Sequence, residues 1–515
     1  GLLKPSLNNS QILGSSLRIP YFHVISKDKD LTLTTNIFDN HIFMVRNEYR
    51  KKTEYSSFIG DFGFTKGYKS TLSKRKKNII HFFSKYNLDL NLENFVTSDL
   101  NLNIQKVTND TYLSIFDTNL QETAVKPSNT SKLSSSINLS LDNENYTFGA
   151  GASVTENLSG KNSDRYQFVM PYYDFSTNLF TKINVGSFNF KSSGSNNLKD
   201  TNNLRSRIVN DLNFSSFDYI SNIGFKNNYG VYLKNLNTVA KNDTAYKSSP
   251  QSELMGIFEA SSSYPLIKFG DRYDSYFTPK ISFRLNPGDM KNHSGGSQKV
   301  SASGVFGINR LGLTDTYEAG KSLTIGLDYK KENIEDINKY FEVKLATVYR
   351  DTVENKIPSI SSLNQKSSNL FGSIKNQINE NYSINYDFSL DNDFNTFEYN
   401  SIGGSLDFDK FQTQIRFIEE DGKRGDANSI EHSFQYTFDE SNYLTFNTRR
   451  NRKINLTEYY NLVYEYKNDC LIAGIKYNKK YYQDRDIQPT EDLLFSITIF
   501  PLTTYEKKFD RGRWL

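Results

Sequence analysis

The residue types that perform chemistry in enzymes are sparse in this sequence and lie far apart. The histidines show no spacing typical of a metal site, and with Cys470 as the single cysteine no zinc cluster can form. Gly320-Lys321-Ser322 matches the end of a phosphate-binding loop, but Asp315 stands where that motif requires glycine, so we interpret the tripeptide as a turn. The sequence therefore predicts no catalytic residue, no metal site and no cofactor. The five histidines are His23, His41, His81, His293 and His432.

One basic run, Lys74-Arg75-Lys76-Lys77, lies between predicted strands that end near Phe64 and begin near Ile79. Such a run is most often only a solvated loop. Because Lys and Arg bind phosphate through charge-assisted hydrogen bonds, the run is also a candidate phosphate contact if the loop faces outward. The whole chain is nearly balanced, with 62 Lys+Arg against 58 Asp+Glu, which argues against a nucleic-acid-binding protein.

The composition favours strands and excludes membrane-spanning helices. At 515 residues the chain exceeds the size at which one core keeps growing, yet only 37% of it is hydrophobic while 14% is aromatic. Asn, Ser, Thr, Tyr and Phe dominate, which is typical of β structure. No run approaches the roughly 18 to 20 apolar residues that a spanning helix needs. A membrane β-barrel stays compatible, because its lipid-facing and water-facing residues alternate.

Apolar and polar residues alternate with a period of two along the chain. The clearest example is Tyr382 to Leu390, where aromatic and aliphatic residues interleave with Ser, Asn and Asp. Residues 323–329, 341–349 and 493–499 repeat the pattern. Short turn clusters, at 142–145 and 391–393, alternate with longer polar loops, predicted at 192–203, 286–298 and 419–428.

This pattern predicts an all-β protein, a large transmembrane antiparallel β-barrel closed between its first and last strands. A strand with half its connections takes about 20 residues, so the length accommodates on the order of 24 to 26 strands. A soluble β array would show a fixed repeat period, and we find none. No composition break divides residues 1–515, which we interpret as one domain.

Three stretches resemble the lipopolysaccharide-assembly family LptD, also called OstA or Imp, and the last is similar to its α-proteobacterial branch. They are Gly1-Leu2-Leu3-Lys4-Pro5-Ser6 with Ile19-Pro20-Tyr21-Phe22, then the segment from Phe306 to Gly320, and the segment from Tyr464 to Ile497. The resemblance implies a translocon of the Gram-negative outer membrane that inserts lipopolysaccharide into the outer leaflet through a lumen and a lateral gate. It implies as partners an LptE-like lipoprotein plug and an LptA-like periplasmic bridge. We expect the family's signal peptide and periplasmic jelly-roll-like domain to lie outside this chain.

In that family the first and last strands meet at a seam that opens sideways. Pro20 matches the seam proline of the first strand, whereas Thr35 stands where the second strand would have its own. A proline removes a ladder donor and so weakens a strand pair. The resemblance implies the following gate residues: Gly14, Ser15, Ser16, Leu17 and Pro20 on the opening strand, and Leu493, Phe495, Ile497 and Ile499 on the closing strand.

Cys470 matches the position where the family ties the barrel to its periplasmic domain by a disulfide. The alternative interpretation is an inert small apolar residue. At the level of function, a porin or receptor barrel that passes small hydrophilic solutes stays open as a rival. An outer-membrane hydrolase is disfavoured, because no nucleophile and base occur together in the sequence.

Overall fold

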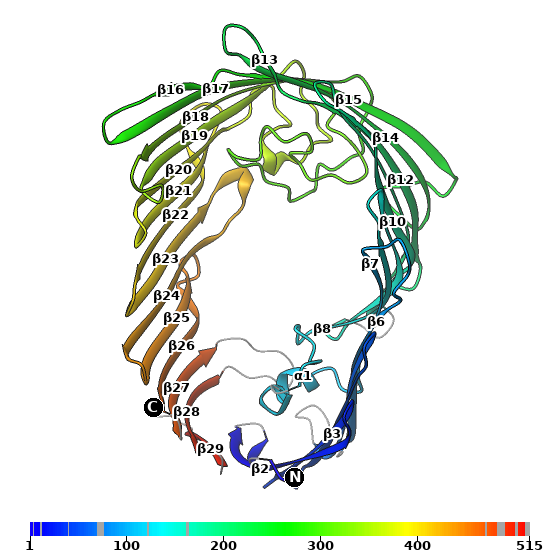
Figure 1. The fold of residues 1–515 in the computed structure, drawn as a ribbon, viewed down its shortest axis with the longest axis vertical. Helices are drawn as coiled ribbons and strands as arrows, with labels where there is room; N and C mark the ends of the chain where they lie inside the picture. The colour runs from blue at the N-terminus through cyan, green and yellow to red at the C-terminus, as the bar shows by residue number, and fades with distance from the viewer. Residues whose placement is uncertain are drawn as a thin grey trace.

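The computed structural model describes residues 1–3, 5–10, 13–39, 41–68, 77–120, 123–160, 164–468, 471–480, 490–499 and 503–509. Within these residues almost every regular element is a strand of one sheet, and, apart from the short β13 and β16, each strand from β2 to β29 pairs antiparallel with the next. Viewed end-on, the sheet curves into a ring in which the first strands and β29 come together on the same side (Figure 1). The predicted all-β barrel is confirmed.

The elements follow the chain in a simple up-and-down order. The strands are β1 (Ser6–Ser10), β2 (Gly14–Ser26), β3 (Lys29–Phe38), β4 (Phe43–Lys52), β5 (Ser56–Tyr68), β6 (Lys77–Asp89), β7 (Thr97–Val107), β8 (Lys132–Asp142), β9 (Tyr146–Asn157), β10 (Tyr166–Lys182), β11 (Gly186–Lys199), β12 (Asn203–Ser216), β13 (Tyr219–Ile220), β14 (Lys226–Lys241), β15 (Gln251–Ser263), β16 (Leu266–Lys268), β17 (Tyr273–Asn286), β18 (Gly320–Asn333), β19 (Tyr340–Arg350), β20 (Leu370–Asn379), β21 (Tyr382–Leu390), β22 (Phe397–Phe408), β23 (Phe411–Glu420), β24 (Asn428–Asp439), β25 (Asn442–Asn451), β26 (Leu456–Lys467), β27 (Leu471–Lys480), β28 (Thr490–Ile499) and β29 (Thr503–Phe509). The helices are α1 (Tyr112–Ile115), η1 (Asp117–Leu120), η2 (Ser359–Ser361) and η3 (Gly422–Arg424).

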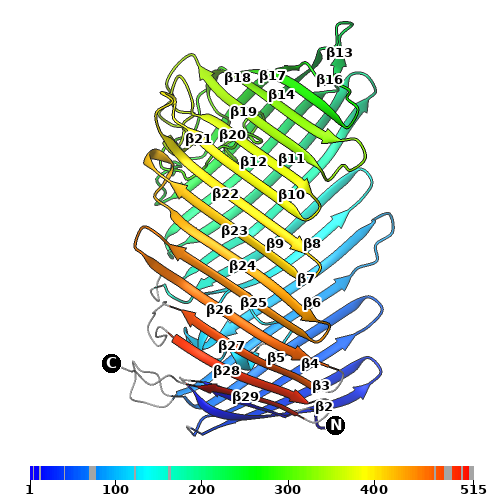
Figure 2. The same cartoon turned by 90° about the vertical axis from the view of Figure 1, so that its left-hand side faces the viewer.

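The number of wall strands agrees with the prediction. β12 pairs directly with β14, and β15 pairs directly with β17. β13 and β16 are therefore short extensions and not separate strands of the barrel wall. Setting these two and the short β1 aside leaves 26 of the 29 described strands. The strands run obliquely to the barrel axis and follow one another in chain order, as Figure 2 shows for β20 to β29.

The two faces of the sheet differ, because successive side chains of a strand point to opposite sides. In β14, Lys234, Leu236 and Thr238 are buried on the inner face, whereas Val231 and Leu233 are exposed on the outer face. The same exposed apolar band continues around the outside. Apolar surface of this extent is typical of a wall that contacts lipid. Its members on other strands include Ile80, Ile137, Ile208, Phe258, Ile281, Ile325, Ile402, Ile415 and Leu462.

The two rims of the barrel carry connections of different length. One rim, called here the short-turn rim, has tight turns such as those at 27–28, 143–145 and 183–185. The opposite long-loop rim carries connections 108–131, 287–319 and 351–369. This asymmetry is characteristic of outer-membrane barrels, whose longer loops face outward. Among the described residues, no helix is long and apolar enough to span a membrane.

Most predicted strands are confirmed, but one predicted loop is wrong. β18, β19, β21 and β28 contain the four alternating segments named above. The polar run 192–203, predicted as a loop, instead forms the second half of β11, with a turn only at 200–202. Its Ser and Asn residues stay in the sheet because β10 and β12 supply full backbone ladders on both sides. Gly320 has a φ of +84° where the long loop enters β18, so Lys321 and Ser322 are already strand residues rather than a turn.

Candidate functional site: the seam and the lumen beside it

The two ends of the sheet are joined through β1. β1 pairs antiparallel with β2, from Ser6↔Arg18 to Ser10↔Gly14, and Gly14 has the positive φ (+76°) that this tight reversal requires. On its other side β1 pairs parallel with β29, through Ser6↔Thr504 and Leu7↔Tyr505. In the described part of the wall this two-residue parallel ladder is the shortest join around the ring. We call the β1–β29 boundary the seam.

Pro20 weakens the seam side of β2. The Leu3 amide donates to the Pro20 carbonyl (2.8 Å), and the Phe22 amide donates to the Gly1 carbonyl (2.8 Å). The carbonyl of Pro20 therefore points toward residues 1–3, which bridge to β2 at Leu2 and Tyr21, and an N–H at this residue would point the same way. Proline has none, so the reciprocal bond to residues 1–3 cannot form. The sequence signal at Pro20 thus falls on the boundary nearest to the seam.

The predicted gate residues lie on the second strand to either side of the seam. In β2, Ser16 and Pro20 are buried on the lumen face and Leu17 is exposed on the outer face. Leu493, Phe495, Ile497 and Ile499 belong to β28, which pairs with β27 and β29. β1 and β29 therefore stand between the two predicted gate strands, and the gate assignment stays a prediction.

Two further predicted sites lie largely beyond the described part of the chain. Cys470 is outside the described residues, and so are Lys74, Arg75 and Lys76. Lys77 is the first residue of β6, which places the end of the basic run at the long-loop rim.

A pocket of about 370 Å³ opens on the lumen wall next to the seam. Three arginines, Arg18, Arg46 and Arg50, line it together with the apolar Leu3 and Phe22. Arg50 donates to Asp30 (2.7 Å), and its guanidinium lies 5.9 Å from the centre of the Phe22 ring. Guanidinium groups beside apolar side chains suit an amphiphile that carries anionic groups. The remaining lining residues are Thr32, Thr34 and Glu48.

A folded segment covers this pocket at the long-loop rim. Residues 108–120, called here the seam cap, turn into the barrel, where Figure 1 shows α1 inside the ring. The side chain of Tyr112 is buried against the inner wall. The Tyr112 hydroxyl lies 2.6 Å from Nδ1 of His81, and Arg46 donates to the Asn119 carbonyl (2.6 Å) and to Asp61 (2.7 Å). Burial raises the pKa of Tyr112, so its phenol stays neutral. A molecule moving up the lumen beside the seam meets the seam cap above it.

Removing the Tyr112 hydroxyl is expected to loosen the seam cap. Tyr112→Phe deletes one buried hydrogen bond to His81, which costs about 1 kcal/mol of local stability. Hydrogen exchange of residues 108–120 in the detergent-solubilised protein should speed up about fivefold. Tyr459→Phe is the matched control, because its hydroxyl has no hydrogen bond to a described residue. Equal protection of the cap in both variants would contradict this role for Tyr112.

The opposite side of the lumen is covered by a second folded region. Residues 287–319, called here the far cap, pack with 351–369 inside the ring (Figure 1). Arg310 donates to Glu318 (2.8 Å), and Arg350 also contacts this carboxylate. Burial raises the pKa of Glu318, but the charges of Arg310, Arg350 and Arg284 outweigh it and bring the pKa down to about 2. The far cap is therefore held by a buried ion network.

These capping residues were not found from the sequence as functional residues. His81 was one of the scattered histidines, and Arg46 and Arg50 lay in a segment for which no specific prediction was made. The available signal was the alternation Arg46, Glu48, Arg50, which places three charged side chains on one face of β4. Among the described residues, no group of three His, Cys, Asp or Glu side chains could hold a metal ion.

The antiparallel sheet, joined into a ring through the parallel β1–β29 pair, its apolar exterior and its capped polar lumen define a large membrane-type β-barrel. The chain belongs to the LptD family, because the family described as LPS transport system D matches residues 82–449, more than half of its length. It is similar to the LPS-assembly proteins LptD of Legionella pneumophila strains Lens and Paris, with 29% identity over 163 residues in each. That alignment covers 30% of this chain and 19% of each relative, so only a small part of the relatives' length is matched.

Proposed function

We propose that this barrel delivers lipopolysaccharide to the outer leaflet of a Gram-negative outer membrane, by way of its lumen and a lateral gate at the seam. The observation that carries the proposal is membership of the LPS transport family. The rim asymmetry supports an orientation with the long-loop rim outside and the short-turn rim toward the periplasm.

The lateral route is supported by the arrangement of pocket, cap and seam. Cargo entering from the short-turn rim would reach the arginine-lined pocket, where the seam cap lies across its upward path. The neighbouring β1–β29 ladder is short, and few backbone bonds must break to part it. Phosphates of the cargo would contact Arg18 and Arg50, while its acyl chains would pass outward between β1 and β29. Gly14, Ser15, Ser16, Leu17 and Pro20 would flank the opening on one side, and Leu493, Phe495, Ile497 and Ile499 on the other.

The remaining family features belong to the same proposal. An LptE-like lipoprotein would plug the lumen, and an LptA-like bridge would feed it through a domain outside this chain. Cys470 would bond to that domain, and Lys74 to Lys77 would contact lipopolysaccharide phosphates at the outer rim.

Depletion of the chain in its host tests the proposal. Surface lipopolysaccharide, measured by antibody labelling of intact cells, should fall in step with the protein, while total lipopolysaccharide persists inside. Re-expression should restore the surface signal. Unchanged surface lipopolysaccharide would refute the assignment. Steady conductance of the purified chain in a planar bilayer without any partner protein would favour a solute-passing porin instead.

A further inference from the structure

A polar strip crosses the outer face of the wall from β10 to β15. The orientation is fixed by the far cap, since Arg207 donates to Thr314 (3.0 Å) and Lys234 lies 5.0 Å from the Tyr317 ring. Thr314 and Tyr317 lie inside the lumen, so the adjacent residues Ile208 and Asn235 point outward.

The side chains of the strip bond to one another across the strands. The hydroxyls of Tyr173 and Ser192 lie 3.1 Å apart, and Ser192 donates to Asn210 (2.7 Å). Asn210 donates to Asn235 (3.2 Å), which in turn donates to Ser252 (3.2 Å). A polar group facing hydrocarbon is costly unless it is hydrogen-bonded. The mutual bonds satisfy five polar side chains on a face whose exposed large residues are mainly apolar or aromatic.

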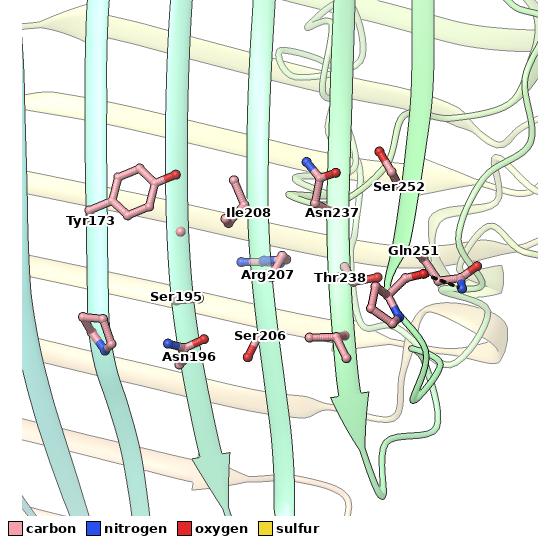
Figure 3. Close-up of a pocket in the computed structure, with 14 residues that line it drawn as sticks. Tyr173, Ser195, Asn196, Ser206, Arg207, Ile208, Asn237, Thr238, Gln251 and Ser252 are labelled. Atoms are coloured by element: carbon pink, nitrogen blue, oxygen red, sulfur yellow. Dashed lines mark hydrogen bonds between the residues drawn. The ribbon is translucent and has the colours of Figure 1, made fainter.

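A pocket of about 410 Å³ lies beside this strip, on its long-loop side (Figure 3). Its sides include Tyr173, Ile208 and Asn237. The Tyr173 ring lies across Gly194, where an added Cβ would come 2.2 Å from a ring carbon, so glycine is needed for this arrangement. The volume lies within the range for a single bound small molecule.

Two polar side chains of the pocket have no partner in the described structure. Asn196 of β11 and Ser206 of β12 are paired across the strands and share the outward face of Ile208, yet neither side chain makes a hydrogen bond to a described residue. Ser206 is three residues beyond Asn203, so it lies about 10 Å along the strand from the long-loop rim. This depth corresponds to the outer-leaflet half of the wall. Unpaired donors and acceptors at that depth point to a ligand that supplies both.

We propose that this outer pocket holds the acyl chain of an outer-leaflet lipid by an amide or hydroxyl group close to the headgroup. The proposal rests on the outer-membrane orientation proposed above. The Asn196 amide and the Ser206 hydroxyl each donate and accept, which matches an amide or hydroxyl better than an ester, which only accepts. Arg207 is the one charged residue of the lining, and its side chain points into the lumen, so phosphate is not the recognised group. Ile208, Val239 and Pro250 supply apolar contact for the chain.

Lipid retention tests the proposal directly. The full chain is expressed with its partners, solubilised in mild detergent and analysed by native mass spectrometry after incubation with lipid A or with phosphatidylethanolamine. Lipid A carries amide-linked hydroxyacyl chains, and phosphatidylethanolamine carries esters alone. Replacing both polar groups, as Asn196→Leu with Ser206→Ala, should lower lipid A retention about tenfold, since two hydrogen bonds are lost. Asn197→Leu, one residue along on the lumen face, is the control and should retain lipid A normally.

The outcomes separate this pocket from the lumen route. Loss of lipid A in the double variant, with surface lipopolysaccharide delivery intact, is the result expected. Equal retention by the double variant and the control, or equal retention of both lipids by the unmodified chain, overturns the pocket while leaving the delivery function standing. A photo-reactive residue at Val239 gives a further check: a lipid adduct is expected, and a protein adduct in its place overturns the assignment. Absence of the chain from outer-membrane fractions would instead refute the outer-membrane location that both proposals assume.

Discussion

Cysteines introduced at Leu7 and Tyr505 are expected to form a disulfide that stops delivery of lipopolysaccharide to the cell surface. The two residues are register partners in the parallel β1–β29 ladder. Cross-strand partners lie within reach of a disulfide after a small backbone adjustment. The covalent link would replace the shortest join in the ring by one that cannot part. Surface labelling of lipopolysaccharide should fall to the level of depleted cells and return when a reductant is added.

Two further cysteine pairs locate the moving boundary. Val231→Cys with Phe258→Cys links partners in the continuous β14–β15 wall and should leave delivery unchanged. Asn8→Cys with Ser16→Cys links β1 to β2. If β1 stays attached to β2 when the seam opens, this link should leave delivery of lipopolysaccharide unchanged. Single-cysteine variants control for mispairing with Cys470. If delivery stays normal although the disulfide between the cysteines at positions 7 and 505 is shown to have formed, lipopolysaccharide does not leave through the seam.

The wall of this barrel could be predicted from the sequence because its signal is local. In Tyr382 to Leu390, each residue type reveals its face, since a strand has a period of two. The strand number followed from the chain length, because a strand with half its connections takes about 20 residues. The run 192–199 was missed because Ser, Gly and Asn face outward there, where apolar residues were expected. Its strand is stabilised by partners on β10 and β12 and not by an alternating pattern of its own.

The interior could not be predicted, because it depends on how distant loops fold back. The bond between His81 and Tyr112 joins a wall strand to a loop 31 residues away, and nothing near either residue marks the other. β1 carried no strand signal either, because Ser-Leu-Asn-Asn-Ser has too few apolar residues. Pro20 was the exception. A residue without an N–H weakens a ladder wherever it stands, so its effect could be inferred before its neighbours were known.

Replacing Glu318 by glutamine is expected to release the far cap while the barrel wall stays folded. The carboxylate is buried between Arg310 and Arg350, and loss of its charge leaves two guanidinium groups without adequate compensation. Breaking a buried ion network in this way costs about 3 to 5 kcal/mol. The wall should survive, because its strands are held by backbone ladders that do not involve this side chain. Hydrogen exchange should therefore increase strongly in residues 287–319 and remain slow in β14 and β15.

The same carboxylate predicts a pH dependence that separates charge from packing. Its pKa is about 2 in the folded chain and 4.5 in the unfolded reference, so it stabilises the far cap fully above about pH 4.5. As the pH falls from 4.5 toward 2, the carboxylate is protonated and about 3 kcal/mol of that stability is lost. Exchange in residues 287–319, corrected for the intrinsic effect of pH, should show this acid step in the unmodified chain and in the Glu335→Gln control. Glu318→Gln should lack the step, since it has no proton to gain; an acid step of the same size in that variant would assign the stabilisation to another group.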